Sequence, residues 1–316
     1  MTSSMTRREL LKAGSLISAG SILTPTLPAF GAEPGQAELI TRAIPATGER
    51  LPVIGLGTNN YSVTSSEDLG ARREVLQHMP KLGGMLIDTA PAYGRSEEVL
   101  GELIQQLNNR DQFFIATKAT ARSGDIEAAK AMIETSFKRL RTQRIELIQV
   151  HSLQGIDELM PILQELKAAK RIKYLGATTS DDGQHAAMAE AMRKYKLDFV
   201  QLNYSIDDRE SANTLLPLAQ DRGTAVLVNL PFGGRRGSNL FARVSGRQLP
   251  AWAREFDIGS WGQFFLKYVV SHPAVTCTIP GTTKLSHLQE NQRAGRGRLP
   301  NAAQRRRLEE YWAGLS

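Results

Sequence analysis

The stretch Met85-Leu86-Ile87-Asp88-Thr89-Ala90-Pro91-Ala92-Tyr93-Gly94 decides the fold that we predict for this chain. It opens with an apolar run, stops at the carboxylate of Asp88 and turns at once toward Tyr93. Short apolar runs separated by helical patterns are typical of parallel strands that are buried on both faces. The stretch therefore predicts a buried strand whose last residue and following turn present polar side chains.

Two further runs end in the same way. Phe113–Lys118 closes on an amine, and Ile145–His151 closes on an imidazole. If such strands close into a barrel, their C-terminal ends share one rim, where barrels of this type carry their active sites. A carboxylate, a phenol, an amine and an imidazole on one rim predict a proton-transfer site.

The same alternation continues along the chain and predicts an α/β fold. Strand-like runs recur at eight places: Val53–Gly57, Met85–Asp88, Phe113–Lys118, Ile145–His151, Ile172–Thr178, Phe199–Leu202, Ala225–Asn229 and Val275–Ile279. Helical patterns lie between them, among them Ile126–Leu140, Ile156–Ala169, Ala186–Lys194, Ser211–Arg222 and Ser260–His272. This pattern predicts a single (β/α)8 TIM barrel domain over residues 32–316. We also expect an N-terminal β-hairpin around Pro45–Gly48 and one extra helix within Pro300–Leu315.

The segment Pro231–Gly259 exceeds the β/α repeat. A connection this long in a compact domain is usually functional or disordered, and on a barrel rim it would lie over the site as a lid. Trp252, Phe256 and Trp261 then either wall a substrate pocket or pack as a hinge. The single cysteine, Cys277, lies inside an apolar run, which indicates a packed core thiol and excludes an intramolecular disulfide.

Residues 1–31 are expected to be an export signal. Arg7-Arg8 precede the uncharged segment Ala13–Phe30, and Gly31 ends it. Paired arginines indicate the twin-arginine route, so we expect a periplasmic or otherwise exported protein with that machinery as a partner. The many Gly, Ser, Thr and Pro residues make a poor spanning helix, so no stable membrane insertion is expected. Uncleaved tethering and a cytoplasmic protein with a signal-like N-terminus stay open.

The net charge of +7 does not predict binding to nucleic acid. The signal accounts for +2 of it, because Arg7, Arg8 and Lys12 are offset there only by Glu9. The C-terminal arginines carry no nucleic-acid motif, and a solvated helix face is their default interpretation. No two histidines have the spacing of metal ligands, so we predict no metal.

The four rim residues fit carbonyl reduction. Tyrosine is a weak acid at neutral pH, and an ammonium such as that of Lys118 lowers its pKa by stabilising the phenolate. Asp88 would keep that ammonium charged, and His151 could orient a substrate oxygen. Reduction also needs a hydride, which no side chain supplies, so a nicotinamide cofactor is required.

With these residues in view, the chain resembles the aldo-keto reductases from about Leu39 to Ala294. Six motifs match in order: Gly55-Leu56-Gly57-Thr58, Ile87-Asp88-Thr89-Ala90-Pro91-Ala92-Tyr93-Gly94, Ala116-Thr117-Lys118, Gln149-Val150-His151-Ser152, Val200-Gln201-Leu202-Asn203-Tyr204, and Ile279-Pro280-Gly281-Thr282-Thr283-Lys284 running to His287-Leu288-Gln289-Glu290-Asn291. One motif alone is weak, but the ordered set is specific because each motif stands at a predicted strand end.

The resemblance implies a catalytic tetrad. Tyr93 would be the general acid, Lys118 and Asp88 would tune it, and His151 would orient the carbonyl of an aldehyde or ketone. It also implies NADPH held in an extended pose on the rim, and a monomer as the family's common form. The residues that it places along the cofactor are Thr58, Thr178, Thr179, Gln201, Asn229, Pro231, Gly233, Thr282, Thr283, Lys284, His287 and Asn291.

Three positions depart from the family pattern. Asn229 stands where members stack an aromatic ring on the nicotinamide, and Gly281 and His287 stand where many bind the 2′-phosphate. Lys284 or an arginine of Arg235-Arg236 could substitute, so NADPH leads and NADH stays possible. Asn229 also leaves a second function open, an exported nucleotide-binding or sensing module with little turnover. If the chain is exported as an enzyme, its cofactor would be loaded before export and held beneath the lid.

Each tetrad residue also has a structural interpretation when it is taken alone. Asp88 could cap the following helix, Lys118 could form a rim ion pair, and Tyr93 could be a packed aromatic residue. His151 could be a satisfied core histidine. The matching motifs around all four residues favour catalysis, and the substrate itself cannot be identified from the sequence.

Overall fold

The computed structural model describes residues 37–122, 124–234 and 239–315. The predicted export signal, and Arg235 and Arg236, lie outside the described residues. Within them the chain forms one compact unit, Ala37–Ser316. No helix of this described part is long and apolar enough to cross a bilayer.

The central sheet has eight strands: β3 (Leu56–Gly57), β4 (Leu86–Asp88), β5 (Phe114–Ala119), β6 (Ile145–Val150), β7 (Ile172–Thr178), β8 (Phe199–Asn203), β9 (Ala225–Asn229) and β10 (Cys277–Thr278). Each strand pairs in parallel with the next along the order β10 to β3. Parallel bridges Ile54↔Thr278 and Gly57↔Gly281 join the two edge strands. The predicted (β/α)8 barrel is therefore confirmed.

Barrel closure depends on close approach of the backbone at β3. A Cβ atom on Gly57 would lie only 2.7 Å from the carbonyl oxygen of Ile279. The strands expected at Val53–Gly57 and Val275–Ile279 are each only two residues long in the structure. The rest of the pairing between them includes isolated bridges and the hydrogen bond from Gly55 N to Thr278 O, 2.8 Å. A side chain at position 57 would collide with the neighbouring backbone at Ile279, so closure of the barrel requires glycine there.

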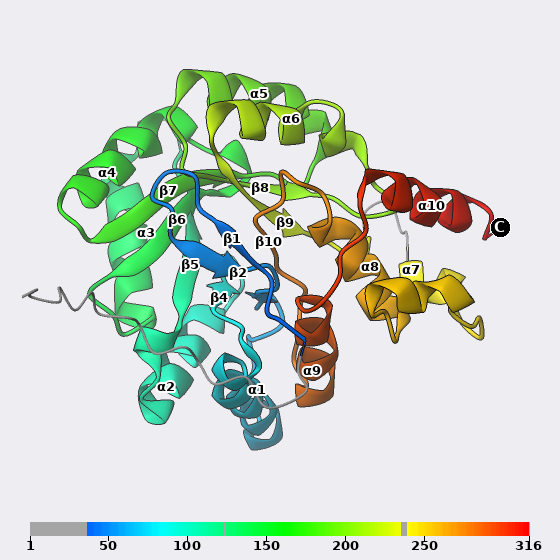
Figure 1. Cartoon of the computed structure of the whole chain (residues 1–316). Helices are drawn as coiled ribbons and strands as arrows, with labels where there is room; N and C mark the ends of the chain where they lie inside the picture. The colour runs from blue at the N-terminus through cyan, green and yellow to red at the C-terminus, as the bar shows by residue number, and fades with distance from the viewer. Residues whose placement is uncertain (1–36, 123, 235–238, 316) are drawn as a thin grey trace, which may run out of the picture. The chain divides into compact units, whose positions relative to one another are not determined.

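Helices surround the strands, as Figure 1 shows. The repeat contains α1 (Ser66–His78), α2 (Ser96–Leu107), α3 (Ile126–Arg139), α4 (Ile156–Ala168), α5 (His185–Lys194), α6 (Leu215–Arg222) and α8 (Trp261–Val270), followed by α9 (Leu285–Ala294). Asp125 caps α3, because its carboxylate accepts the Ala128 N–H at 3.1 Å. The extra C-terminal helix is α10 (Ala302–Ala313).

The predicted N-terminal hairpin consists of β1 (Thr41–Ala43) and β2 (Arg50–Pro52), which pair antiparallel. Ile44 and Leu51 of this hairpin are fully buried. They belong to a hydrophobic cluster with residues of the barrel strands, among them Leu86. Tyr174, in that cluster, donates its hydroxyl hydrogen to Glu49 at 2.6 Å. The hairpin thus covers the N-terminal end of the barrel and leaves the other end for chemistry.

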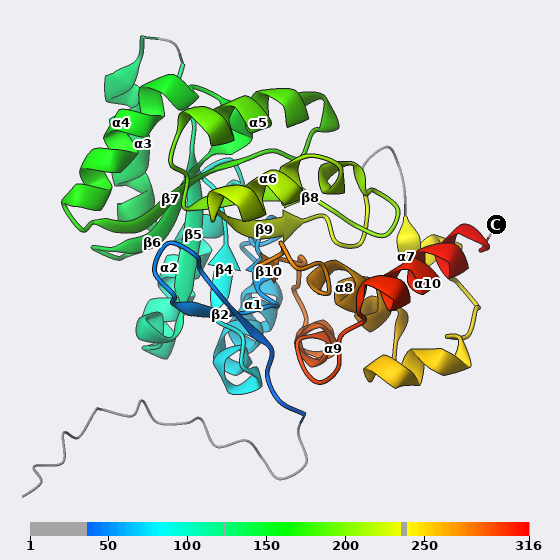
Figure 2. The same cartoon turned by 45° about the horizontal axis from the view of Figure 1, so that its top comes forward.

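The long connection after β9 contains the short helix α7 (Leu240–Arg243) and a 3-10 helix, Ala251–Phe256. Figures 1 and 2 show α7 beside α10, and the Arg243 guanidinium lies 4.2 Å from the centre of the Trp312 ring. Trp252 packs edge-on against Tyr311, with ring centroids 5.6 Å apart. Residues 239–259 thus pack on α8 and α10, so the aromatic residues of the expected lid serve packing rather than a pocket wall.

Candidate active site

The polar residues of the site continue the interior face of the barrel. Side chains alternate along a strand, so residues two apart point to the same side. Leu86, Ala116, Leu147 and Phe199 belong to one buried interior cluster. Two residues further along each strand stand, in the same order, Asp88, Lys118, Gln149 and Gln201. The top interior layer is therefore polar where the layer below it is apolar.

Asp88 and Lys118 form a buried ion pair in this layer. Lys118 Nζ donates to Asp88 Oδ2 at 2.6 Å and to the carbonyl oxygen of Thr89 at 2.9 Å. Burial opposes the charge on Lys118, but the negative charges of Asp88 and of an ionised Tyr93 raise its pKa overall. The pair is deprived of water, so its geometry is held by these specific hydrogen bonds.

Tyr93 lies over this pair, in the turn that follows β4. Its ring centroid is 5.0 Å from Lys118 Nζ. Burial raises the pKa of Tyr93 above its usual value, and the ammonium of Lys118 counteracts only part of that rise. The expected net lowering of this pKa is therefore wrong, because desolvation of the phenolate outweighs the nearby charge.

His151 stands beside Tyr93, with ring centroids 6.1 Å apart and planes at 89°. It begins a 3-10 turn rather than ending a strand, and Ser152 follows with a φ of 52°. Burial, helped by the charge of Lys118, lowers the pKa of His151 to about 4. The imidazole is thus neutral at physiological pH and retains one N–H donor.

Two glutamines complete the layer. Gln201 Nε2 donates to Asp88 Oδ1 at 3.0 Å, and Gln149 Nε2 lies 3.5 Å from the same oxygen. Gln201 was expected at the cofactor, but in the structure its amide holds Asp88. Gln149 had been assigned no role. The signal that could have found it is a polar residue at an interior position of an otherwise apolar strand.

Other predicted cofactor residues gather at the ends of β7 and β9. Thr178 Oγ1 accepts the backbone N–H of Ser152 at 3.1 Å, which joins it to the turn of His151. The carbonyl oxygen of Thr179 accepts from Asn229 Nδ2 at 3.3 Å. Pro231 and Gly233 follow in the next turn, where the Gly233 N–H donates to the Leu230 carbonyl oxygen at 3.0 Å.

The remaining predicted cofactor residues lie near β3 and α9. Thr58 is buried, and its hydroxyl donates to the backbone oxygen of Asp88 at 2.8 Å. Thr282 accepts from Asn291 Nδ2 at 2.9 Å, and among the described residues neither side chain forms a hydrogen bond with the tetrad. Thr283 is half-buried, whereas Lys284 and His287 are exposed at the start of α9. The structure therefore joins Thr58 to the tetrad through Asp88, whereas the residues from Thr282 to Asn291 form a separate group.

The residues at the strand ends fit a nicotinamide group. Within the described residues, four buried polar atoms at or next to the strand ends lack a hydrogen-bond partner: Thr89 Oγ1, Gln149 Oε1, Asn203 Oδ1 and Asn229 Oδ1. Each such atom costs about 1–3 kcal/mol when it is left unpaired. An amide- and hydroxyl-bearing ligand would satisfy them, which is the chemistry that a nicotinamide nucleotide presents.

Comparison with known proteins points the same way. The family model described as the aldo/keto reductase family matches residues 53–311. Aldo-keto reductase YhdN of Bacillus subtilis (strain 168) is 32% identical over 201 residues, which is 59% of this chain and 60% of that protein. The NADH-specific methylglyoxal reductase of Escherichia coli (strain K12) is 31% identical over 181 residues, or 48% of this chain and 53% of that protein. These two matches span less than two thirds of either relative's length.

A solved structure gives the same fold. The aldo-keto reductase from Klebsiella pneumoniae, crystallised in complex with NADPH, aligns with a TM-score of 0.72. The alignment covers 87% of this chain and 96% of that chain at 23% identity. At this identity the likeness supports the barrel fold and no finer property.

Proposed function

The chain belongs to the aldo/keto reductase family, and from this premise we propose that it reduces an aldehyde or ketone to an alcohol with NADPH. The observation that carries the proposal is the buried Lys118–Asp88 pair, 2.6 Å between Nζ and Oδ2, directly below Tyr93. If the Lys118–Asp88 pair had only a structural role, it would not require the phenol of Tyr93 next to it. We assign Tyr93 as the general acid.

Each of the four residues has its own role in the transfer of one proton to the substrate oxygen. When bound, a nicotinamide cofactor supplies the hydride. Tyr93 keeps its proton at neutral pH because its pKa is raised by burial. When that proton passes to the substrate oxygen, the ammonium of Lys118 faces the phenolate that remains, and Asp88 keeps Lys118 charged. The neutral His151 donates its N–H to the substrate oxygen and orients it.

NADPH is the proposed cofactor, with NADH as the alternative. The structural relative from Klebsiella pneumoniae was solved with NADPH, whereas the Escherichia coli relative is named as NADH-specific. In this chain the exposed Lys284 and His287, at the start of α9, would meet a 2′-phosphate. Lys284→Gln should then raise the KM for NADPH and leave the KM for NADH unchanged.

The proposal is tested by following NADPH and NADH oxidation by the chain from residue 32. Aromatic aldehydes, dicarbonyls and quinones form the substrate panel. Tyr93→Phe should lower kcat by about 10²–10⁴-fold, which is the usual contribution of a general acid. Tyr195→Phe is the matched control, because Tyr195 bonds to Asp157 at the end of α5. Equal activity of Tyr93→Phe and its parent would reject the assignment.

A second candidate function rests on Asn229. This residue stands at the position of the stacking aromatic ring of the family, and it bonds instead to the carbonyl oxygen of Thr179. A nucleotide-binding or sensing module with little turnover would tolerate that change. Tight NADPH binding by the purified chain, without turnover on any panel substrate, would favour this module over the reductase.

We further propose that the protein is exported by the twin-arginine route. The support is the sequence Arg7-Arg8 ahead of the uncharged segment Ala13–Phe30. Replacing both arginines by lysine should retain the protein in the cytoplasm, as measured by cell fractionation. If the parent chain itself stays in the cytoplasm, the export proposal is wrong.

If it is exported, we propose that the nucleotide is loaded first, because the twin-arginine route carries folded proteins. Nucleotide released on denaturing the exported protein would support this, and none would contradict it.

A further inference from the structure

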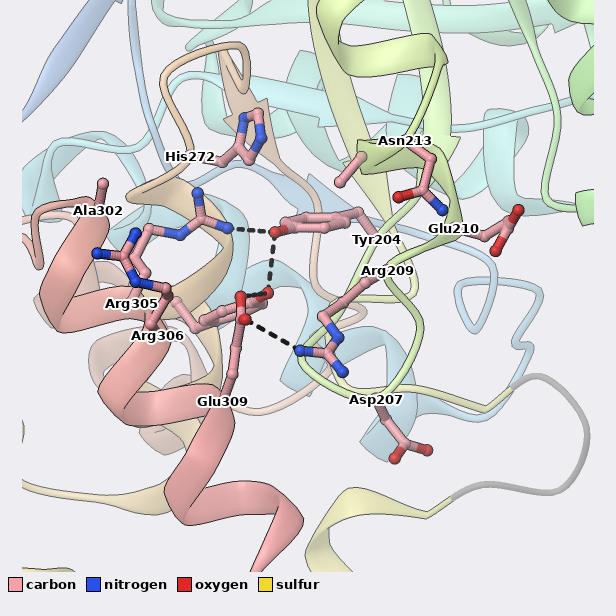
Figure 3. Close-up of a pocket in the computed structure, with 12 residues that line it drawn as sticks. Tyr204, Asp207, Arg209, Glu210, Asn213, His272, Ala302, Arg305, Arg306 and Glu309 are labelled. Carbon is pink, nitrogen blue, oxygen red and sulfur yellow. Dashed lines mark hydrogen bonds and ion pairs between the residues drawn. The ribbon is translucent and has the colours of Figure 1, made fainter.

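A cavity of about 630 Å³ lies between the loop after β8, the helix α8 and the helix α10. Figure 3 shows its lining, which includes Tyr204 from the loop, His272 at the end of α8 and Arg305 from α10. It shares no lining residue with the tetrad. The proposed reductase activity therefore leaves this cavity without a role.

A directional chain of hydrogen bonds crosses the cavity. Arg305 donates to the Tyr204 hydroxyl, which donates to the Tyr268 hydroxyl at 3.0 Å. Tyr268 in turn donates to Glu309 Oε1 at 2.7 Å. Figure 3 shows these bonds as one continuous path. Both hydroxyl hydrogens are therefore donated to acceptors within the protein.

The charges around the cavity leave Arg305 without a counter-ion. Glu309 pairs with Arg209 at 3.0 Å, and Asp207 lies 3.6 Å from Arg243. No carboxylate of the described residues lies within 4.0 Å of the Arg305 guanidinium. Its Nε is moreover buried without a hydrogen-bond partner. A partly buried guanidinium with an unused donor requires an acceptor.

Two neighbours make the surroundings of Arg305 more positive and richer in donors. The guanidinium of Arg42 donates to four backbone oxygens at the end of α8, those of residues 270, 272, 273 and 275, so its charge is met by the helix terminus. His272 Nδ1 accepts the Ala274 N–H at 3.2 Å, which leaves the hydrogen of the neutral ring on Nε2. His272 therefore adds a second N–H donor to the cavity lining.

We propose that this cavity binds a small organic anion through a carboxylate or phosphate group, which accepts from the guanidinium of Arg305 and the N–H of His272. A guanidinium fork matches the oxygens of either group. The volume of about 630 Å³ exceeds that of a single inorganic ion, so a ligand with a further polar body fits. This site goes beyond the proposed reductase function and does not rest on it.

The first test measures binding of inorganic phosphate and of acetate to the chain from residue 32 by calorimetry. At least one anion should bind, and Arg305→Gln should weaken its binding at least tenfold. Arg193→Gln is the control, since it removes an exposed arginine from α5 and should leave binding unchanged. Preference for phosphate would indicate a phosphate ester as the ligand, and preference for acetate would indicate a carboxylate.

Phosphate could also bind where a cofactor phosphate is proposed, at Lys284. If Lys284→Gln abolishes binding while Arg305→Gln does not, the cavity proposal is overturned. Arg305→Gln also removes a contact of α10, so crystals of the parent chain soaked in selenate provide a test that needs no variant. Anomalous density in the cavity beside the Arg305 guanidinium supports the site, and density elsewhere only, or none, contradicts it.

Discussion

Two regions of this molecule contain the same four kinds of side chain. The candidate active site has Tyr93, His151, Lys118 and Asp88. The anion cavity has Tyr204, His272, Arg305 and Glu309, shown in Figure 3. In both, a tyrosine and a histidine meet edge to face, with ring centroids 6.1 Å apart in the first and 5.6 Å apart in the second. Composition alone does not separate them.

The allocation of hydrogen bonds separates the two regions. In the first, the cation is engaged by Asp88 and the Thr89 carbonyl oxygen, and no hydrogen bond donated by the Tyr93 hydroxyl is found among the described residues. In the second, the Tyr204 hydroxyl already donates to Tyr268. A phenol acts as an acid only when its proton is not committed to the protein. The pattern of hydrogen bonds, rather than the residue types, therefore distinguishes Tyr93 as the candidate acid.

The largest effect expected from this comparison is on catalysis. Tyr93→Phe should cost about 10²–10⁴-fold in kcat, which equals roughly 3–5 kcal/mol of activation free energy. Tyr204→Phe should change kcat by less than about threefold and instead lower the free energy of unfolding by about 1 kcal/mol, because its bonds join the loop after β8 to α8 and α10. Steady-state kinetics and urea unfolding of both variants check this. Equal losses of activity in Tyr93→Phe and Tyr204→Phe would show that the two tyrosines do not differ in their importance for catalysis.

The next effect concerns the two carboxylates. Asp88→Asn leaves the ammonium of Lys118 buried without its partner, so the free energy of unfolding should fall by about 3–5 kcal/mol. Glu309→Gln should cost less than about 1 kcal/mol, because Arg209 is 49% exposed and water replaces the carboxylate. Urea unfolding at pH 7 measures both. Similar costs would mean that burial does not distinguish the pairs.

A smaller effect is expected in the pH dependence of stability. Burial lowers the pKa of both His151 and His272 from 6.5 to about 4. As the pH falls from 6.5 to 4, the unfolded chain binds protons that the folded chain does not, so stability falls in this window. Because both rings are partly exposed to solvent, we expect about 1 kcal/mol for each.

His151→Gln and His272→Gln should each reduce the loss of unfolding free energy between pH 6.5 and 4 by about 1 kcal/mol. Above pH 6.5 the pH dependence of the unfolding free energy should be the same in each variant and in the parent. Urea unfolding of each variant and of the parent at pH 7 and pH 4.5 gives the difference. An unchanged loss in either variant would show that its ring is protonated in the folded state as readily as in the unfolded chain.

The smallest effect concerns salt. The Arg209–Glu309 pair lies near the surface, so its contribution of a few tenths of a kcal/mol should disappear in about 1 M salt. The buried Lys118–Asp88 pair should keep its contribution under the same conditions. Double-mutant cycles at low and high salt measure both couplings. Loss of both couplings would place the Lys118 pair in contact with solvent.

Much of the fold was predictable from local pattern. β7 and β9 have the predicted bounds, Ile172–Thr178 and Ala225–Asn229, because each is an apolar run between clear turn signals. The C-terminal end of β6 differs by one residue, since His151 begins a turn in which Ser152 takes a left-handed backbone that periodicity does not reveal. Cys277 is buried in the core, as predicted.

The candidate site was predictable in position but not in its electrostatics. The strand ends do bring Asp88, Lys118 and Tyr93 together, as their spacing along successive strands indicated. The net direction of the Tyr93 pKa depends on how much water reaches the phenol, which no spacing encodes. The bond from Gln201 to Asp88 was not predictable for a similar reason, since only the register of β8 brings the Gln201 amide to Asp88. The catalytic and cofactor roles themselves stay predictions.

The sequence by itself determined the alternation of buried strands and helices, and therefore the barrel and the residues at its rim, because periodicity and strand ends are local properties of the chain. Only the tertiary structure decided which polar groups share hydrogens. Tyr204 and Arg305 are 101 residues apart, and Tyr204 and Tyr268 are 64 apart, so their contact depends on how α8 and α10 pack on the barrel. Burial and hydrogen-bond partners are set by that packing, and they distinguish the proposed proton donor Tyr93 from the tyrosines of the proposed binding cavity.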